Sequence, residues 1–285
     1  MVNKITLRDG RALAYAEYGD PRGKPVFFFH GTPGSRLFHP VDDVTTRVGV
    51  RLITTDRCGY GESTFLPDRR LLDWPNDVAQ LADALGFGKF AIIGHSGGGP
   101  HTLACAYALP DRITAAATIA GAGPIETPGA ADNMVPINKF GFKYGQYFPW
   151  PIMLALNSVL FHERCTNPAK AFDNDKTRPP ADQAIMDRPE IRELCITTEV
   201  EAFKPGIKGM AWDVRLITRP WGFRLEEIKV PVQIWHGTAD NVTSIRMAQY
   251  MAGKIPNSRL ITCPEEGHML LIPHWEEILT TLCNA

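Results

Sequence analysis

The sequence predicts an α/β fold: a mostly parallel central sheet with helices on both faces, interrupted by a helical insertion. Two observations lead to this prediction. Short apolar runs alternate with amphipathic stretches of helical period along most of the 285 residues. The alternation stops over 124–225, a range that holds 11 of the 23 prolines, and prolines at that density confine helices to short pieces. We therefore expect a core domain made of 1–123 and 226–285, and a helical cap domain made of 124–225.

The predicted strands begin with a hairpin. An apolar segment at 5–7 and an alternating segment at 11–19 flank the dipeptide Asp9-Gly10, a combination that favours two antiparallel strands. The later strands are continuous apolar runs, which are typical of strands buried on both faces. Six such runs follow in the chain, at 25–31, 51–56, 90–96, 113–121, 230–237 and 258–264.

The predicted helices lie between these runs, as a parallel sheet requires. The first has Pro75 near its start and Gly86 at its end, the positions at which these residues favour a helix boundary. The four predicted helices span 74–86, 98–110, 244–255 and 274–283.

Composition excludes several classes of function. Thirty Lys and Arg residues balance 31 Asp and Glu residues, so the net charge of -1 offers no footprint for nucleic acid. No apolar stretch approaches the roughly 20 residues of a membrane span, and the first residues do not resemble a signal peptide. The six cysteines are scattered without metal-ligand spacing. We expect a cytoplasmic protein with reduced thiols, no membrane span, no metal and no cofactor, whose partner is a small molecule; its oligomeric state stays open.

The segment Gly94-His-Ser-Gly-Gly98 contains the candidate nucleophile, Ser96. It fits the pattern G-x-S-x-G and stands between a predicted buried strand and a predicted helix, which is the context that this pattern needs. Small neighbours allow a sharp, strained turn that exposes the serine hydroxyl. The backbone N–H of Gly97 and the start of the helix would lie beside that hydroxyl. The alternative is a phosphate-binding turn, which the absence of a following lysine and the different glycine spacing disfavour.

A second backbone donor is predicted at Thr32. The segment HGTPGSR at 30–36 follows the predicted strand 25–31 and forms a tight turn that can direct the Thr32 N–H toward Ser96. Two donors suit a tetrahedral intermediate, because its negative charge is concentrated on one oxygen. His30 is expected to hold this loop through hydrogen bonds and to transfer no proton.

The candidate base and acid follow the last two predicted strands. A nucleophilic serine needs a base, and the base needs an orienting carboxylate. Asp240 lies after the strand at 230–237, and His268 lies between the last strand and the last helix. We expect His268 Nε2 about 2.6–3.2 Å from Ser96 Oγ, or somewhat farther without ligand. Asp240 as a simple helix N-cap and His268 as a core histidine are the competing interpretations.

These segments resemble the α/β-hydrolase family with a cap. The resemblance covers 1–123 and 226–285, and its motifs are HGTPGSR at 30–36, DRCGYGES at 56–63, GHSGGG at 94–99, WHGTADNV at 235–242 and EGHM at 266–269. It implies a catalytic triad of Ser96, Asp240 and His268, and an oxyanion hole from the N–H groups of Thr32 and Gly97. The turn DRCGYGES is usually structural in the family, which keeps Asp56, Arg57 and Ser63 out of the catalytic set.

The resemblance narrows the reaction only in part, because one fold supports many functions. Serine in place of aspartate at position 96 argues against epoxide hydrolases and haloalkane dehalogenases. Thr32 and Gly97 depart from the motifs of proline iminopeptidases. We expect a serine carboxylesterase acting on a small-to-medium hydrophobic ester. The alternatives are a carbon–carbon bond hydrolase, a lactonase, an aminopeptidase-like hydrolase, a perhydrolase-type peroxidase, a lyase such as a hydroxynitrile lyase and a ligand-binding protein without hydrolytic activity.

The expected substrate character rests on one segment of the insertion. Residues 147–161 contain ten large apolar side chains, more than a helix with a single buried face would need. We expect this segment to pack on the core domain and to line an apolar pocket above Ser96.

Overall fold

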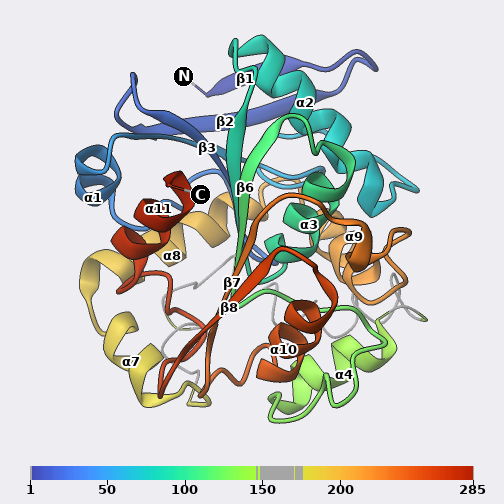
Figure 1. Cartoon of the computed structure of the whole chain (residues 1–285), viewed down its shortest axis with the longest axis vertical. Helices are drawn as coiled ribbons and strands as arrows, with labels where there is room; N and C mark the ends of the chain where they lie inside the picture. Colours follow the sequence, from blue (N-terminus) through green and yellow to red (C-terminus); the bar gives the residue numbers. More distant parts are fainter. Residues whose placement is uncertain (1, 146, 148–169, 171–175, 285) are drawn as a thin grey trace.

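The computed structural model describes residues 2–145, 147, 170 and 176–284 (Figure 1). Its centre is an eight-stranded sheet in the order β1-β2-β4-β3-β5-β6-β7-β8. The pairs β1–β2 and β2–β4 are antiparallel, and all the others are parallel. The strands are β1 (Asn3–Thr6), β2 (Ala12–Gly19), β3 (Lys24–Phe29), β4 (Val50–Thr55), β5 (Phe90–His95), β6 (Ile113–Ile119), β7 (Val232–Gly237) and β8 (Ser258–Cys263).

The predicted mostly parallel sheet is confirmed, and the hairpin supplies its antiparallel edge. Each predicted strand is present with bounds shifted by one or two residues. The run at 113–121 ends as a strand at Ile119, because Ala120 takes a left-handed φ of 47° that an extended strand cannot continue.

Helices cover both faces of the sheet (Figure 1). On one face lie α2 (Trp74–Ala84), α3 (Gly98–Ala108) and α10 (Ile245–Lys254); on the other lie α1 (Asp42–Arg47) and α11 (Trp275–Cys283). The sequence analysis did not predict α1, whose six residues, DDVTTR, show no apolar periodicity. Its Thr45 accepts a hydrogen bond from Trp275 Nε1 at 2.9 Å, so packing on α11 and on the sheet favours this helix. Two short 3-10 helices, η1 (Leu71–Asp73) and η2 (Leu225–Glu227), complete this part.

The two faces of the sheet form two separate apolar clusters. Along β3, Phe27 and Phe29 enter one cluster with Ile92, whereas Val26 and Phe28 enter the other. Successive side chains of a strand point to opposite faces. A strand with both faces buried therefore needs a continuous apolar run, which is the pattern seen in the sequence.

Residues 124–225, called the insertion below, lie between β6 and β7 in the chain, and their described part is helical. It contains α4 (Pro136–Tyr144), α7 (Pro180–Met186), α8 (Pro189–Ala202) and α9 (Lys208–Ile217). Three of these four begin with proline, which is tolerated in the first turn because its nitrogen needs no partner there. The segment predicted to line the pocket, 147–161, lies outside the described residues except for Tyr147.

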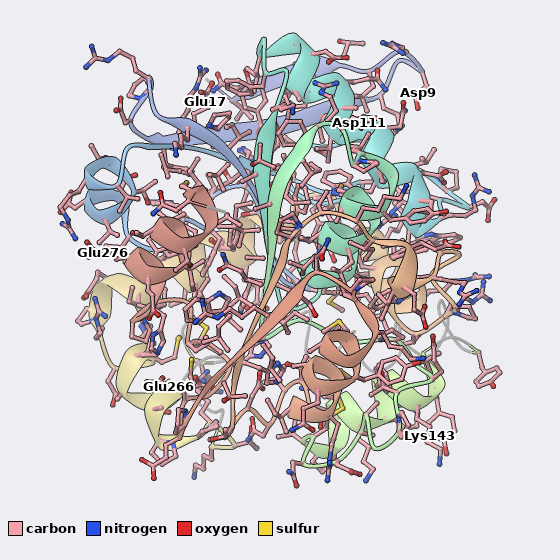
Figure 2. The ribbon with its side chains drawn as sticks, viewed as in Figure 1. Asp9, Glu17, Asp111, Lys143, Glu266 and Glu276 are labelled. Carbon is pink, nitrogen blue, oxygen red and sulfur yellow. The ribbon has the colours of Figure 1, made fainter. Side chains whose placement is uncertain are left out.

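Charged side chains of both signs lie at the periphery of the molecule. Asp9, Lys143 and Glu276 project outward from three separate regions (Figure 2). None of the helices in the described ranges has both the length and the apolar character needed to cross a bilayer.

Candidate active site

Ser96 lies in the tight turn between β5 and α3, at the carboxyl edge of the sheet. Its φ is 53°, the left-handed conformation that the motif predicts. The turn is fixed to the neighbouring strand, because Ser96 N donates to Ile119 O at 2.9 Å. A Cβ atom at Gly98 would collide with the carbonyl oxygen of Phe29, so the chain needs glycine there for α3 to begin against β3.

The loop after β3 lies against this turn. A Cβ atom at Gly31 would be 3.4 Å from Ser96 Cβ, and one at Gly97 would collide with the Thr32 side chain. Among the described residues, neither Thr32 N nor Gly97 N has a hydrogen-bond acceptor. The arrangement can therefore offer two backbone N–H groups, on adjacent loops, to a negatively charged oxygen bound at Ser96.

Asp240 and His268 form a hydrogen-bonded pair. His268 Nδ1 donates to Asp240 Oδ2 at 2.8 Å. The pair joins the loops after β7 and β8, which are neighbours in the sheet. Asp240 is not the N-cap of α10: that position belongs to Ser244, whose side chain accepts a hydrogen bond from Arg246 N.

Asp240 is held rigidly by its own loop. Its carboxylate also accepts hydrogen bonds from Val242 N at 2.8 Å, from Thr243 N at 3.0 Å and from Thr243 Oγ1 at 2.9 Å. The His236 ring is close, with Nε2 3.6 Å from Asp240 Oδ2, but its hydrogen bond goes to Thr243 O. The carboxylate is thus oriented before any substrate arrives.

The two ionisable groups of this pair shift each other's pKa. Burial alone would lower the pKa of His268, but the charge of Asp240 and its hydrogen bond raise that pKa above its usual value. Burial alone would raise the pKa of Asp240, but the same partner lowers it to about 2. Asp240 therefore stays ionised near neutral pH, and His268 Nδ1 carries the proton that faces it.

His95 connects the serine turn to the histidine loop. Its Nε2 donates to His268 O at 3.0 Å, and the rings of His95 and His268 lie 4.9 Å apart between centroids. Burial and the nearby His268 lower the pKa of His95 to about 3, so this ring stays neutral. The structure records no hydrogen bond between Ser96 Oγ and His268 Nε2. Such contacts are often long without ligand and tighten when substrate binds.

His30 holds its loop, as expected. Its Nδ1 donates to Gly31 O at 2.7 Å, while its Nε2 accepts from Arg57 N at 3.2 Å. Burial and the nearby Arg57 charge hold the pKa of His30 well below its usual value, so the ring stays neutral.

A buried ionic cluster supports the loop after β3, which contains Thr32. Arg57 donates to the carbonyl oxygens of His30 and Gly31, the latter at 2.9 Å, and to Thr32 Oγ1 at 3.0 Å. The same guanidinium donates to Asp213 Oδ2 from Nη2 at 2.7 Å. Asp213 belongs to α9 of the insertion and also pairs with Arg69 Nη2 at 2.6 Å.

The cluster also touches the serine turn. His101 Nε2 lies 3.7 Å from Asp213 Oδ1, and His101 Nδ1 donates to Gly97 O at 3.0 Å. Although burial opposes it, the charge of Arg57 lowers the pKa of Asp213. One carboxylate of the insertion is therefore linked to both loops that present the two N–H groups.

The five sequence-predicted residues lie at one edge of the sheet, on the loops after β3, β5, β7 and β8. Sequence reasoning missed Asp213, whose acidic side chain lies in a helix without a motif. Arg57 was assigned a structural role, which the contacts of its guanidinium support. A further carboxylate of the insertion, Asp182, contacts the backbone of the histidine loop. Within the described ranges, no group of three or more His, Cys, Asp and Glu side chains is arranged to hold a metal ion.

Comparisons with known proteins support the fold described above. A family model described as the alpha/beta hydrolase fold matches residues 24–149. A bifunctional esterase/perhydrolase of Acinetobacter calcoaceticus is 27% identical over 276 residues, covering 93% of this chain and 92% of that protein. A proline iminopeptidase of Xylella fastidiosa is 34% identical over 119 residues, but these cover only 39% of this chain and 36% of that protein. The solved structure of a hydrolase from Pseudomonas aeruginosa superposes with a TM-score of 0.73 at 20% identity, covering 100% of this chain and 98% of that one.

Proposed function

This chain belongs to the α/β-hydrolase family, and we propose that it is a serine carboxylesterase. Its substrate would be a small-to-medium hydrophobic carboxylic ester, cleaved through an acyl-enzyme intermediate. The observation that carries the proposal is the Asp240–His268 hydrogen bond at 2.8 Å, with the His268 ring packed against His95, the neighbour of Ser96. Ser96 itself has the φ of 53° that suits a nucleophile turn. The likeness over nearly the whole chain to a protein named esterase/perhydrolase supports the choice of an ester.

Each residue has one task in the proposed reaction. Ser96 Oγ attacks the ester carbonyl while His268 Nε2 takes its proton, and the same proton is then delivered to the leaving alcohol. Asp240 holds the imidazole in the tautomer with Nδ1 protonated and stabilises the imidazolium. The N–H groups of Thr32 and Gly97 bind the oxyanion. Water then attacks the acyl-enzyme, with His268 again acting as base, and releases the acid.

The insertion would act as a cap that shapes the substrate pocket. Ile217, at the end of α9, approaches the oxyanion side of the site: its Cδ1 would lie 3.2 Å from a Cβ atom at Gly97. An apolar side chain of the insertion at this place supports a hydrophobic acyl or alcohol group in the substrate.

Perhydrolysis is a second candidate activity. In that reaction hydrogen peroxide attacks the acyl-enzyme in place of water, forming a peracid and releasing Ser96. The observation that favours it is the name of the relative that covers most of this chain, which joins the two activities. The same nucleophile, base and oxyanion donors would serve both reactions.

The deciding experiment is turnover of p-nitrophenyl esters by the purified protein, run beside lactone, peptide and carbon–carbon bond substrates and with hydrogen peroxide added to one ester reaction. Ester cleavage lost in Ser96→Ala supports the proposal. Cleavage of a lactone, a peptide or a carbon–carbon bond in preference to esters would assign one of the alternative hydrolases. Turnover without a trapped acyl-enzyme would indicate a lyase, and binding without turnover a ligand-binding protein.

A further inference from the structure

The insertion contacts the candidate base through Asp182, which lies in the first turn of α7. Asp182 Oδ2 accepts a hydrogen bond from His268 N at 2.8 Å, and its Oδ1 accepts one from Met269 N at 2.8 Å. The residue is 3% exposed. A buried carboxylate held by two backbone N–H groups, from two successive residues, fixes the loop that carries the imidazole.

Asp182 differs from an ordinary buried ion-pair partner. Among the described residues, no Lys or Arg side chain forms an ion pair with it. A buried negative charge without a countercharge is costly, so a positive charge that forms nearby is favoured. The carboxylate of Asp182 would therefore stabilise the positive charge that His268 acquires in the reaction. Asp182 contributes to raising the pKa of His268, in addition to the larger effect of Asp240.

The local sequence is adapted to this contact. Any Cβ atom at Gly267 would collide with the Asp182 carboxylate, so the glycine of the EGHM motif leaves room for an acid that lies 85 positions earlier in the chain. The backbone of His268 is then held at both ends, its N–H by Asp182 and its carbonyl by His95 Nε2.

We propose that Asp182 is a positioning residue for the catalytic base: it fixes the backbone of His268 and adds a second negative charge beside the imidazolium. This inference rests on the proposed function of His268. It gives the insertion a part in the acid–base chemistry, in addition to covering the pocket.

The charged and titratable groups that face His268 determine how the test is interpreted. They are Asp240 at 2.8 Å from the ring, the neutral His95 ring packed against it at a tilt, Asp182 on its backbone and His236 on the far side of Asp240. Burial lowers the pKa of His236, which keeps that ring neutral beside them. Of the two carboxylates, only Asp182 can be neutralised without breaking the hydrogen bond to the imidazole.

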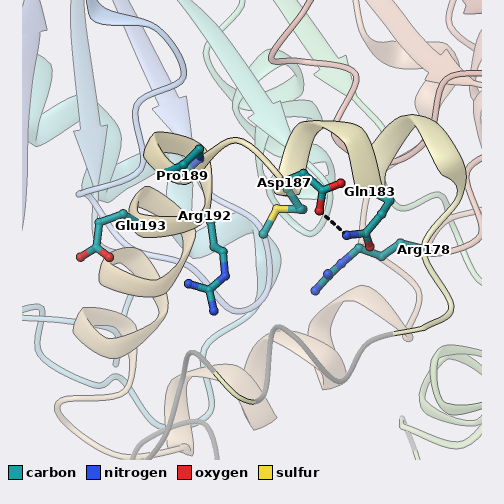
Figure 3. A pocket seen from close by; sticks show the side chains of 7 residues that line it. Arg178, Gln183, Asp187, Pro189, Arg192 and Glu193 are labelled. Atoms are coloured by element: carbon teal, nitrogen blue, oxygen red, sulfur yellow. Dashed lines mark hydrogen bonds between the residues drawn. The ribbon is translucent and has the colours of Figure 1, made fainter.

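The test compares Asp182→Asn with Asp187→Asn. Asp187 follows α7, is exposed, and accepts a hydrogen bond from Gln183 Nε2 at 2.7 Å at the wall of a pocket of about 450 Å³ between α7 and α8 (Figure 3). We expect Asp182→Asn to lower kcat by about 10²-fold, because a small displacement of a catalytic group has that effect. The acid limb of kcat/KM should move to lower pH, since the lost charge no longer favours the imidazolium. Asp187→Asn should change neither.

NMR titration of the His268 ring separates this inference from the proposed function, because it needs no ester. We expect the pKa of His268 to be lower in Asp182→Asn than in wild type and unchanged in Asp187→Asn. An unmoved pKa and an unmoved acid limb would overturn the inference, whether kcat falls or not. Absence of ester turnover in the wild type would instead count against the proposed function. If Asp182→Asn fails to fold, Gly267→Ala displaces the same carboxylate and should lower the pKa of His268 in the same direction.

Discussion

Two buried carboxylates of the insertion hold the two ends of the candidate site in different ways. Asp213 supports the loop after β3 and is compensated by two guanidinium groups, those of Arg57 at 2.7 Å and Arg69 at 2.6 Å. Among the described residues, the hydrogen-bond donors to Asp182 are two backbone N–H groups of the histidine loop. The first arrangement fixes geometry and is insensitive to the protonation of His268. The second leaves a negative charge whose effect depends on the charge of the neighbouring ring.

The largest loss of activity should come from replacing Ser96 or His268, the two residues proposed to react. Ser96→Ala and His268→Ala should each lower kcat by several orders of magnitude, up to about 10⁶-fold, because each removes the proton-transfer pair. The double variant should lose little more than either single variant, since the two residues act as a unit. Steady-state kinetics of the three variants on one ester measure this. Losses that add up would mean that Ser96 and His268 act in separate steps.

Substitution of Asp213, which supports the loop after β3, should strongly reduce the stability of the protein. Asp213→Asn leaves Arg57 and Arg69 buried without their countercharge, which should lower the free energy of unfolding by about 3–5 kcal/mol. Urea unfolding measures this, with Glu276→Gln as the control. Glu276 pairs with Arg47 at the surface, where the two side chains are 57% and 58% exposed, so that change should cost no more than about 1 kcal/mol. Equal losses in the two variants would contradict the assigned role of the cluster.

The pH profile of kcat/KM should distinguish Asp182, whose charge acts on His268, from Asp213, whose charge does not. A base must be neutral to take a proton, so kcat/KM should fall as the pH drops through the pKa of His268. Asp240 raises that pKa, which places the midpoint of the acid limb above about 6.5. Asp213→Asn should lower kcat without moving this midpoint, because its carboxylate faces Arg57 and Arg69. A midpoint below that of a free histidine, or one that moves in Asp213→Asn, would refute this comparison.

The strand-borne part of this site could be predicted from the sequence, whereas the insertion's part could not. Ser96, Asp240 and His268 each follow a continuous apolar run, and parallel strands place their carboxyl ends at one edge. Asp182 and Asp213 reach the same loops from helices without a motif. Their contacts span 86 and 156 positions, and no local periodicity records a contact of that range. Helix α1 was missed for a related reason, since packing and not its own pattern favours it.

The smallest predicted effect concerns substrate length. Each added methylene on the acyl chain should raise kcat/KM by up to about fourfold, the equivalent of burying one CH₂ group in an apolar pocket. A series of p-nitrophenyl esters from acetate to hexanoate measures this, and charged amino-acid esters should be poor substrates. A flat or falling series would contradict an apolar pocket formed with the insertion.

Covalent labelling of Ser96 tests the central claim most directly. A serine-directed phosphonate should add its mass once to the wild-type protein, on the peptide that contains Ser96, and should leave Ser96→Ala unlabelled. His268→Ala should react far more slowly, because the hydroxyl has lost its base. Labelling at another serine would contradict the assignment of Ser96 as the nucleophile. Full ester turnover by Ser96→Ala would contradict it as well.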